Sequence, residues 1–165
     1  MKQLLRYFAL LLSLGVLLSA LGACGREDMT ARERLSSLLR LFEPLPAGQV
    51  YATAPTAGDE YLDARLIEAL YRRSDGYFEY EGRVSEAAVY LGSARDPFFE
   101  AAVFVCYGNA DTRAILDMCI RRVRLVASSH SVGEEDAVFA VSGRTVICII
   151  TKDTATANRV IEKLV

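Results

Sequence analysis

The stretch AAVFVC, residues 101–106, decides the fold, because six apolar residues follow one another with no polar side chain between them. A half-exposed strand alternates apolar and polar residues, whereas a strand that is apolar throughout is typical of burial on both faces of a sheet. The stretch VICII, residues 146–150, has the same character. We therefore expect these two segments to be the central strands of one sheet.

Each of these strands has a second strand before it and a helix after it. The strands are predicted at residues 84–91, 98–107, 137–141 and 145–151, and the helices at residues 110–127 and 153–165. The predicted class is α+β, with a four-stranded, mainly antiparallel sheet built from two strand-strand-helix units. We expect both of these helices on one face, and the N-terminal helices or the aromatic segment 77–80 on the other.

The two units share some local sequence. EAAVY at residues 86–90 resembles EDAVF at 135–139, and Val105-Cys106 resembles Ile147-Cys148. An internal repeat explains this likeness, and so does the chance similarity of hydrophobic strands. The sequence leaves both explanations open.

The N-terminal half contains two further helices and one short strand. Thr30 and Glu33 form a capping-box pattern at the start of a helix over residues 30–44. Its apolar positions, Leu35, Leu38, Leu39 and Phe42, lie on one helical face. We favour packing of this face on the domain, and the alternative is contact with a membrane. A strand at residues 49–53 and a helix at 63–73 complete this half.

The first 24 residues have the organisation of an export signal with a lipid attachment site. Lys2 and Arg6 precede an uncharged run over residues 7–21, and LGAC at residues 21–24 resembles a lipobox. We expect a signal peptide at 1–23, a lipid (diacylglyceryl and palmitate) on Cys24 and a tether at 24–29. This predicts a lipoprotein on the extracytoplasmic face of the cell membrane. The alternatives are an ordinary secretory signal or an uncleaved membrane anchor.

The remaining chain reads as one domain, residues 45–165, preceded by the helix at 30–44. Removal of residues 1–23 leaves 17 basic against 21 acidic residues, a net charge of −4. No basic tract is present, so nucleic acid is not an expected partner. Membrane contact through the lipid on Cys24, and a protein or envelope partner, are the interactions that the sequence predicts.

The sequence contains no recognisable catalytic constellation. Its single histidine, His130, lies in a serine-rich connection, and Cys106, Cys119 and Cys148 lie in apolar surroundings. No zinc-ligand spacing, nucleophile elbow or nucleotide-binding glycine loop occurs. We therefore expect no catalytic residue, cofactor or metal site, and a non-enzymatic binding or accessory domain. The alternative is an envelope hydrolase or thiol enzyme that pairs His130 with a cysteine.

Three charged or aromatic groups each allow two interpretations. The acidic run at residues 134–136 is a solvated turn or a weak cation site. Arg121, Arg122 and Arg124 form a solvated helix face or attract an anionic polymer or lipid. An aromatic group covers the core or forms a recognition surface, and we favour the core; its members are Tyr51, Tyr61, Tyr71, Tyr77, Phe78 and Tyr80.

Three sequence patterns resemble a known family. They are LPAGQVY at 45–51, YLD at 61–63 with LY at 70–71, and GRTVI at 143–147 with TKD at 151–153. They are similar to small lipoproteins of clostridia-type Gram-positive bacteria that are catalogued as a domain of unknown function. The resemblance covers roughly residues 45–165. It implies a lipobox, a single extracytoplasmic domain on a Gram-positive membrane and no established activity, and it supplies no catalytic residues.

Overall fold

The computed structural model describes residues 29–71, 78–94 and 97–164. The predicted signal peptide, Cys24 and nearly all of the tether therefore lie outside the described residues, as do Tyr77 and the last two positions of the helix predicted at 63–73. Among the described helices, none has both the length and the hydropathy that a membrane span needs.

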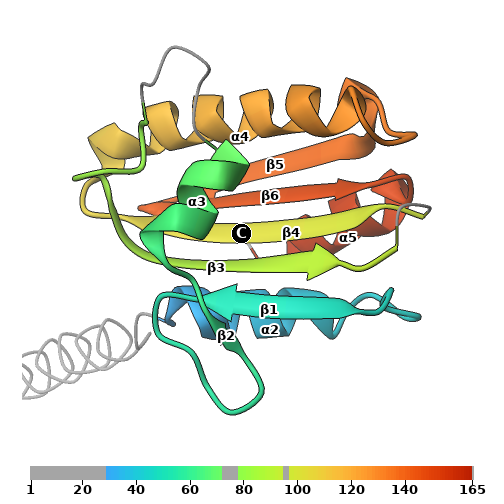
Figure 1. Cartoon of the computed structure of the whole chain (residues 1–165), viewed down its shortest axis with the longest axis horizontal. Coiled ribbons are helices and arrows are strands. Elements are labelled where there is room, and N and C mark those ends of the chain that lie inside the picture. The colour runs from blue at the N-terminus through green and yellow to red at the C-terminus, as the bar shows by residue number, and fades with distance from the viewer. Residues whose placement is uncertain (1–28, 72–77, 95–96, 165) are drawn as a thin grey trace, which may run out of the picture.

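The centre of the fold is one six-stranded sheet in the order β2-β1-β3-β4-β6-β5 (Figure 1). Its strands are β1 (Gly48–Ala52), β2 (Glu60–Tyr61), β3 (Val84–Gly92), β4 (Phe99–Cys106), β5 (Ala137–Ser142) and β6 (Thr145–Thr151). The β1–β2 pair is parallel and every other neighbouring pair is antiparallel. The α+β class and the central position of β4 are confirmed, whereas β6 is an interior strand next to the edge strand β5.

The predicted number of four strands is wrong. The short strand at the start of the domain joins the same sheet, because β1 pairs along its whole length with β3, from Gly48 opposite Gly92 to Ala52 opposite Ala88. The two residues of β2 then pair with the end of β1. This makes the sheet mixed rather than antiparallel throughout.

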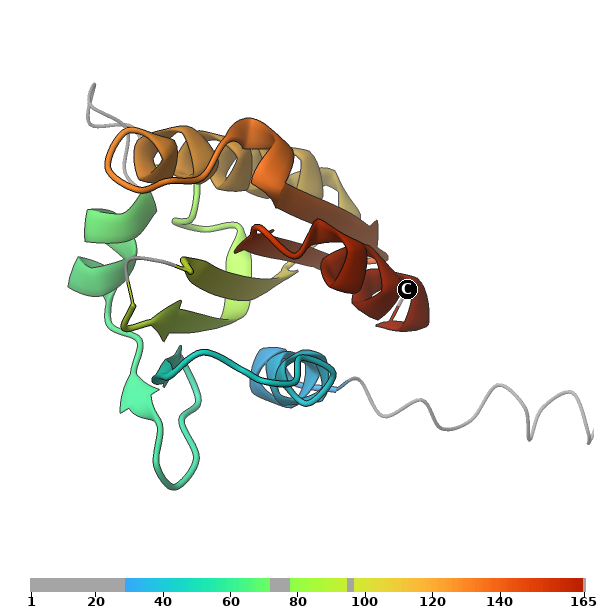
Figure 2. The ribbon, with the colours of Figure 1, turned by 90° about the vertical axis from the view of Figure 1, so that its right-hand side faces the viewer.

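Helices cover both faces of the sheet, so the fold has three layers (Figures 1 and 2). The helices are α2 (Ala31–Leu39), α3 (Ala64–Tyr71), α4 (Thr112–Ala127) and α5 (Thr154–Leu164). Apolar residues of α3 and α4 pack in one cluster on the sheet, and those of α2 and α5 in a second. The expectation that α4 and α5 share a face is therefore wrong.

Successive side chains of β4 enter different clusters, which explains the unbroken apolar run at residues 101–106. Ala102 and Phe104 pack under α3 and α4, whereas Ala101 and Val103 pack under α2 and α5. Side chains alternate between the two faces of a strand, so a strand with helices above and below it needs an apolar residue at every position.

Helix α2 packs on the sheet, as the favoured interpretation of its apolar spacing expected. Glu33 N–H donates to Thr30 Oγ1 at 3.2 Å and Thr30 N–H donates to Glu33 Oε2 at 2.9 Å, which confirms the capping box. The helix ends at Leu39 rather than at residue 44, because Leu41 and Phe42 donate to carbonyls three residues back. The ring of Phe42 then lies 4.9 Å from that of Phe99.

The structure does not favour an internal repeat. The helices that follow the two hairpins, α4 and α5, cover opposite faces. Within the similar pentapeptides, Tyr90 packs in the α2–α5 cluster and the matching Phe139 packs against the α3–α4 cluster. Two copies of one unit would keep matching side chains in matching layers, so chance similarity is the better explanation.

Candidate functional site

His130 lies just after α4 and contacts an aromatic ring rather than a thiol. Its ring centroid is 4.5 Å from that of Phe98, the residue before β4. Its Nδ1 lies 2.9 Å from Ser129 Oγ and 3.3 Å from the carbonyl oxygen of Val126. These contacts hold the imidazole against the end of the α3–α4 layer.

The structure does not bring His130 to any of the three described cysteines. Cys106 ends β4, eight residues beyond Phe98, which at about 3.3 Å per residue places it roughly 26 Å away. Cys148 lies opposite Ala102, four residues or about 13 Å along the same strand. Cys119 packs in the same cluster as Cys148, in the same part of the core. The alternative Cys-His enzyme therefore lacks the contact that its nucleophile needs.

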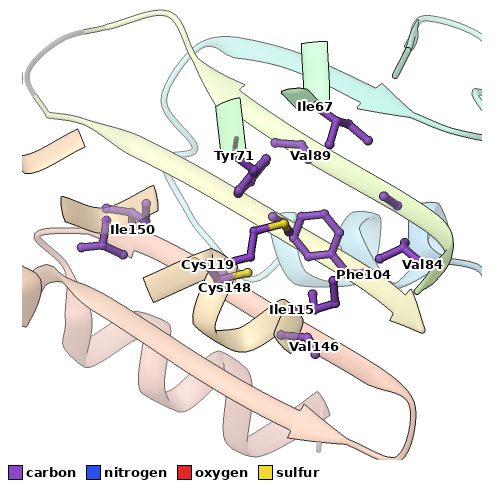
Figure 3. Packing of buried hydrophobic residues seen from close by; sticks show 14 of the residues in the cluster. Ile67, Tyr71, Val84, Val89, Phe104, Ile115, Cys119, Val146, Cys148 and Ile150 are labelled. Carbon is purple, nitrogen blue, oxygen red and sulfur yellow. The ribbon is translucent and has the colours of Figure 1, made fainter. Parts of the chain in front are cut away.

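All three described cysteines are free, buried thiols, and Figure 3 shows two of them, Cys119 and Cys148, among the packed side chains of the core. Burial, together with the nearby Asp111 carboxylate, raises the pKa of the Cys106 thiol to about 11. The hydrogen bond from Cys119, followed by burial, raises the pKa of the Cys148 thiol well above its usual value. Because the thiolate is the reactive form, both shifts disfavour nucleophilic chemistry.

A buried ion pair joins the sheet to α4. Arg122 donates through Nη2 to Glu100 Oε2 at 2.7 Å and through Nε to Glu100 Oε1 at 3.1 Å. Tyr71 donates its hydroxyl to Glu100 Oε1 at 3.3 Å, and Arg122 Nη1 lies 3.5 Å from the carbonyl oxygen of Leu70. Glu100 is 2% exposed. Sequence analysis missed this cluster, although a single acid within the apolar run 98–106 was a signal for it.

The electrostatics of this cluster stabilise its charged state. Burial lowers the pKa of the Arg122 guanidinium, but its hydrogen bonds and attraction to Glu100 outweigh burial and leave the pKa raised. Burial, and then the neighbouring Glu100 carboxylate, raise the pKa of Tyr71. A carboxylate that accepts from both a guanidinium and a phenol is satisfied within the protein, so the cluster fixes α3, β4 and α4 together rather than presenting a reactive group.

The arginines of α4 are paired with acids, so they do not form a basic patch. Arg124 Nε lies 2.8 Å from Glu134 Oε1, and Arg122 is held by Glu100. Arg121 is paired with the buried Glu79. The interpretation as a helix face with neighbouring acids is supported, except that Arg122 is largely buried rather than solvated. Because these arginines are paired with acids, the helix gives no basis for the attraction of an anionic lipid or polymer.

The acidic run that precedes β5 serves local structure. Asp136 Oδ2 accepts from the N–H of Gly133 at 2.8 Å, and Glu134 is engaged by Arg124. Within residues 29–71, 78–94 and 97–164, no group of three or more histidine, cysteine or acidic side chains is arranged to hold a metal ion. The solvated-turn interpretation fits these contacts.

The outer side of α2 carries a shallow hollow of about 280 Å³. It is lined by Met29, Glu33, Ser36, Ser37 and Arg40. Pockets that hold drug-sized ligands usually measure 300–1,000 Å³ and are mostly apolar. This hollow is smaller, and four of its five lining residues are polar or charged, so it does not indicate a small-molecule site.

Three tyrosines, Tyr61, Tyr80 and Tyr107, form what we term the tyrosine surface. Tyr61 and Tyr107 are each 63% exposed. Burial raises the pKa of the Tyr80 phenol to about 12, with further contributions from Tyr107 and then Tyr61, so Tyr80 lies between these two exposed tyrosines and within electrostatic reach of each. No signal in the sequence marked Tyr107 as a surface residue, because it directly follows a buried strand.

The tyrosine surface rests on the core. The ring of Tyr80 stacks on that of Phe78 at 5.6 Å and meets the edge of the buried Phe104 at 6.4 Å. The N–H of Tyr107 donates to the carbonyl oxygen of Arg83 at 2.9 Å. The favoured core-cover interpretation therefore holds for Tyr71, which is buried, and in part for Phe78 and Tyr80, which pack against the core. It is wrong for Tyr61, which projects into solvent.

Comparisons with known proteins do not identify the chain: neither the family models, the curated proteins nor the solved structures that were searched contain a match.

Proposed function

We propose that this protein is a lipid-anchored, extracytoplasmic binding domain that docks a protein partner on its tyrosine surface. The observation that carries the proposal is the exposure of Tyr61 and Tyr107 beside the half-buried Tyr80. Tyrosine is enriched at protein interfaces, because its ring supplies apolar area and its hydroxyl a hydrogen bond at a low entropic cost. The rings of Phe78 and Phe104 hold that of Tyr80 in place, and a preorganised side chain loses less entropy on binding.

The predicted anchor determines where such a surface would work. Helix α2 begins seven residues after Cys24, and seven residues span at most about 25 Å. Arg32, in the first turn of α2, donates to Asp59 at 2.7 Å. Asp59 directly precedes β2, so the Tyr61 end of the tyrosine surface lies close to the start of α2. The partner that fits this arrangement is the extracytoplasmic part of a protein in the same membrane.

The site geometry supports binding more than catalysis. The described cysteines are buried, and their thiols have a raised pKa or lie beside another thiol. His130 contacts Phe98. Glu100 accepts hydrogen bonds from both Arg122 and Tyr71. A catalytic site needs a reactive group that substrate can approach. The exposed groups that the structure gathers in one place are instead tyrosines.

Site-specific photo-crosslinking in cells tests this function. A photoreactive phenylalanine analogue replaces Tyr61 or Tyr107, and as a control it replaces Leu125, which is 51% exposed on α4. We expect one membrane protein to be captured from both tyrosine positions and not from Leu125. Capture from Tyr61 should fall when Tyr107 is changed to alanine. Equal adducts at all three positions, or none at either tyrosine, would contradict the proposal.

A further inference from the structure

The two helix layers of the fold differ in charge. Helices α2 and α5 cover one face of the sheet, and α3 and α4 cover the other (Figures 1 and 2). Residues 29–44 and 152–164, which contain α2 and α5, together carry six basic and four acidic residues. Residues 45–151 carry 10 basic and 15 acidic residues. The layer formed by α2 and α5 is therefore net positive, although the rest of the domain is net negative.

Two arginines of α2 have uncharged partners. Arg34 donates through Nε to the carbonyl oxygen of Met29 at 3.1 Å, and Arg40 donates through Nη2 to Ser37 Oγ at 3.2 Å. Neither forms an ion pair with an acid among the residues that the structure describes, whereas the arginines of α4 all do. The charges of Arg34 and Arg40 therefore remain available to an anionic surface.

Exposed apolar side chains flank these arginines. Met29, just before α2, is 40% exposed, and Leu41, just after it, is 38% exposed. Met29 and Arg40 line the same shallow hollow, so they lie on one side of the helix, which we term the outer side of α2. Basic and apolar side chains together are typical of a surface that lies at a membrane interface.

Chain length places the outer side of α2 close to the predicted lipid. Met29 is five residues after Cys24, and five residues span at most about 18 Å. Helix α2, with nine residues, is only about 13 Å long. A lipid on Cys24 would therefore hold the whole outer side within about 30 Å of the bilayer, at a high effective concentration relative to the headgroups.

We propose that the outer side of α2 docks on the anionic headgroups of the membrane that holds the lipid anchor. Arg34 and Arg40 face the lipid phosphates in this orientation. Met29 and Leu41 enter the headgroup region. The docking rests on the proposed function, because the lipid anchor brings α2 to the bilayer. Each basic residue near an anionic surface strengthens binding about fivefold. Tyr80 packs against the opposite cluster, so the tyrosine surface stays accessible to a partner.

Quenching of a fluorophore by lipid-borne nitroxide tests the docking. In lipidated Leu41→Cys the new cysteine alone takes the label, because Cys24 carries the lipid and the three described cysteines are buried. The protein is reconstituted into phosphatidylcholine vesicles with or without about 30% phosphatidylglycerol. We expect quenching at position 41 to be at least about twofold greater with phosphatidylglycerol. Leu125→Cys, at an exposed position on α4, is the matched control and should stay unquenched.

Charge variants separate electrostatic docking from mere proximity. Arg34→Gln/Arg40→Gln should lower the quenching at position 41 at least about twofold in the anionic vesicles. An increase in salt to about 0.5 M should have the same effect, because it screens exposed charges. Arg113→Gln/Arg124→Gln removes the same charge from α4 and should leave the quenching unchanged. Circular dichroism verifies that each variant is folded.

The possible failures are distinguishable. A protein that does not float with either kind of vesicle would refute the lipid anchor, and the docking with it. A protein that floats but shows no lipid quenching at position 41 would refute the docking alone. Equal quenching with and without phosphatidylglycerol, or quenching that Arg34→Gln/Arg40→Gln leaves unchanged, would also overturn it. Protection of the label from aqueous iodide without lipid quenching would identify a protein, such as a second copy, as the occupant instead.

Discussion

Arg122 on α4 holds Glu100 on β4 through Nη2–H and Nε–H, with the closest contact at 2.7 Å, inside the α3–α4 layer of the core. Glu100 is the single charge in a strand that is otherwise apolar. The pair therefore ties the longest described helix to the central strand, with Glu100 buried and the Arg122 side chain 16% exposed.

Removal of one member of this pair should be costly. We expect Arg122→Met to lower the free energy of unfolding by about 3–5 kcal/mol, because Glu100 is left buried without a counter-charge. The double variant Glu100→Leu/Arg122→Met should recover most of that loss, since it removes both charges. Urea unfolding of the single and double variants measures the difference. A double variant that loses as much stability as Arg122→Met, or more, would contradict a compensated pair.

Phe104 and Tyr107 lie three residues apart, yet they should respond in opposite ways to truncation. Phe104 is fully buried, and Phe104→Ala should cost about 3–5 kcal/mol through lost burial and a residual cavity. Tyr107 is exposed, and Tyr107→Ala should change stability by no more than about 0.5 kcal/mol. Chemical denaturation of both variants is the measurement. If Tyr107→Ala proved equally destabilising, Tyr107 would belong to the core and not to the tyrosine surface.

The three described thiols should be unreactive in the folded state. With a pKa of about 11, the Cys106 thiol is only about one part in a thousand thiolate at pH 8, and Cys119 and Cys148 are buried together. In a Cys24→Ala background, we expect a thiol reagent to modify the folded protein at least about 100-fold more slowly than the urea-unfolded protein. Rapid modification of a single cysteine under native conditions would revive the thiol-enzyme alternative.

Asp59 should make the free energy of unfolding depend on pH. Its hydrogen bond from Arg32, assisted by bonds from Thr56, holds the pKa of the carboxyl well below its usual range. A depressed folded pKa contributes stability above the unfolded value of about 3.9, and this contribution is lost as the pH falls toward the folded value. Wild type should therefore lose stability below about pH 4 more steeply than Asp59→Asn. Urea unfolding from pH 7 to pH 2.5 is the measurement, and parallel curves would show that the Arg32 contact is not formed in solution.

The sequence predicted the features that depend on local pattern. Unbroken apolar runs identified β4 and β6 as interior strands, and the Thr30–Glu33 pair identified the start of α2. The four-strand prediction failed because β1 is short, so only its pairing with β3 places it in the sheet. The faces of α4 and α5 could not be predicted, since each helix is amphipathic and would pack equally well on either side of an apolar sheet.

The functional features were harder to predict, because they depend on contacts between residues that lie far apart in the sequence. Glu100 and Arg122 are 22 residues apart, and no local spacing relates a strand acid to a helix base. The tyrosine surface combines residues from β2, the segment before β3 and the end of β4, which only the folded sheet brings together. The aromatic group predicted from the sequence included Tyr61 and Tyr80 but missed Tyr107.

The central claim is that a lipid on Cys24 holds this domain at the outer surface of a membrane, and intact mass spectrometry of the protein from a membrane fraction tests it most directly. The account predicts a chain that begins at Cys24, lacks residues 1–23 and carries the added mass of a diacylglyceryl group. The Cys24→Ala variant should lose that mass and leave the detergent phase on phase separation. An unmodified chain that still contains residues 1–23 would contradict the account.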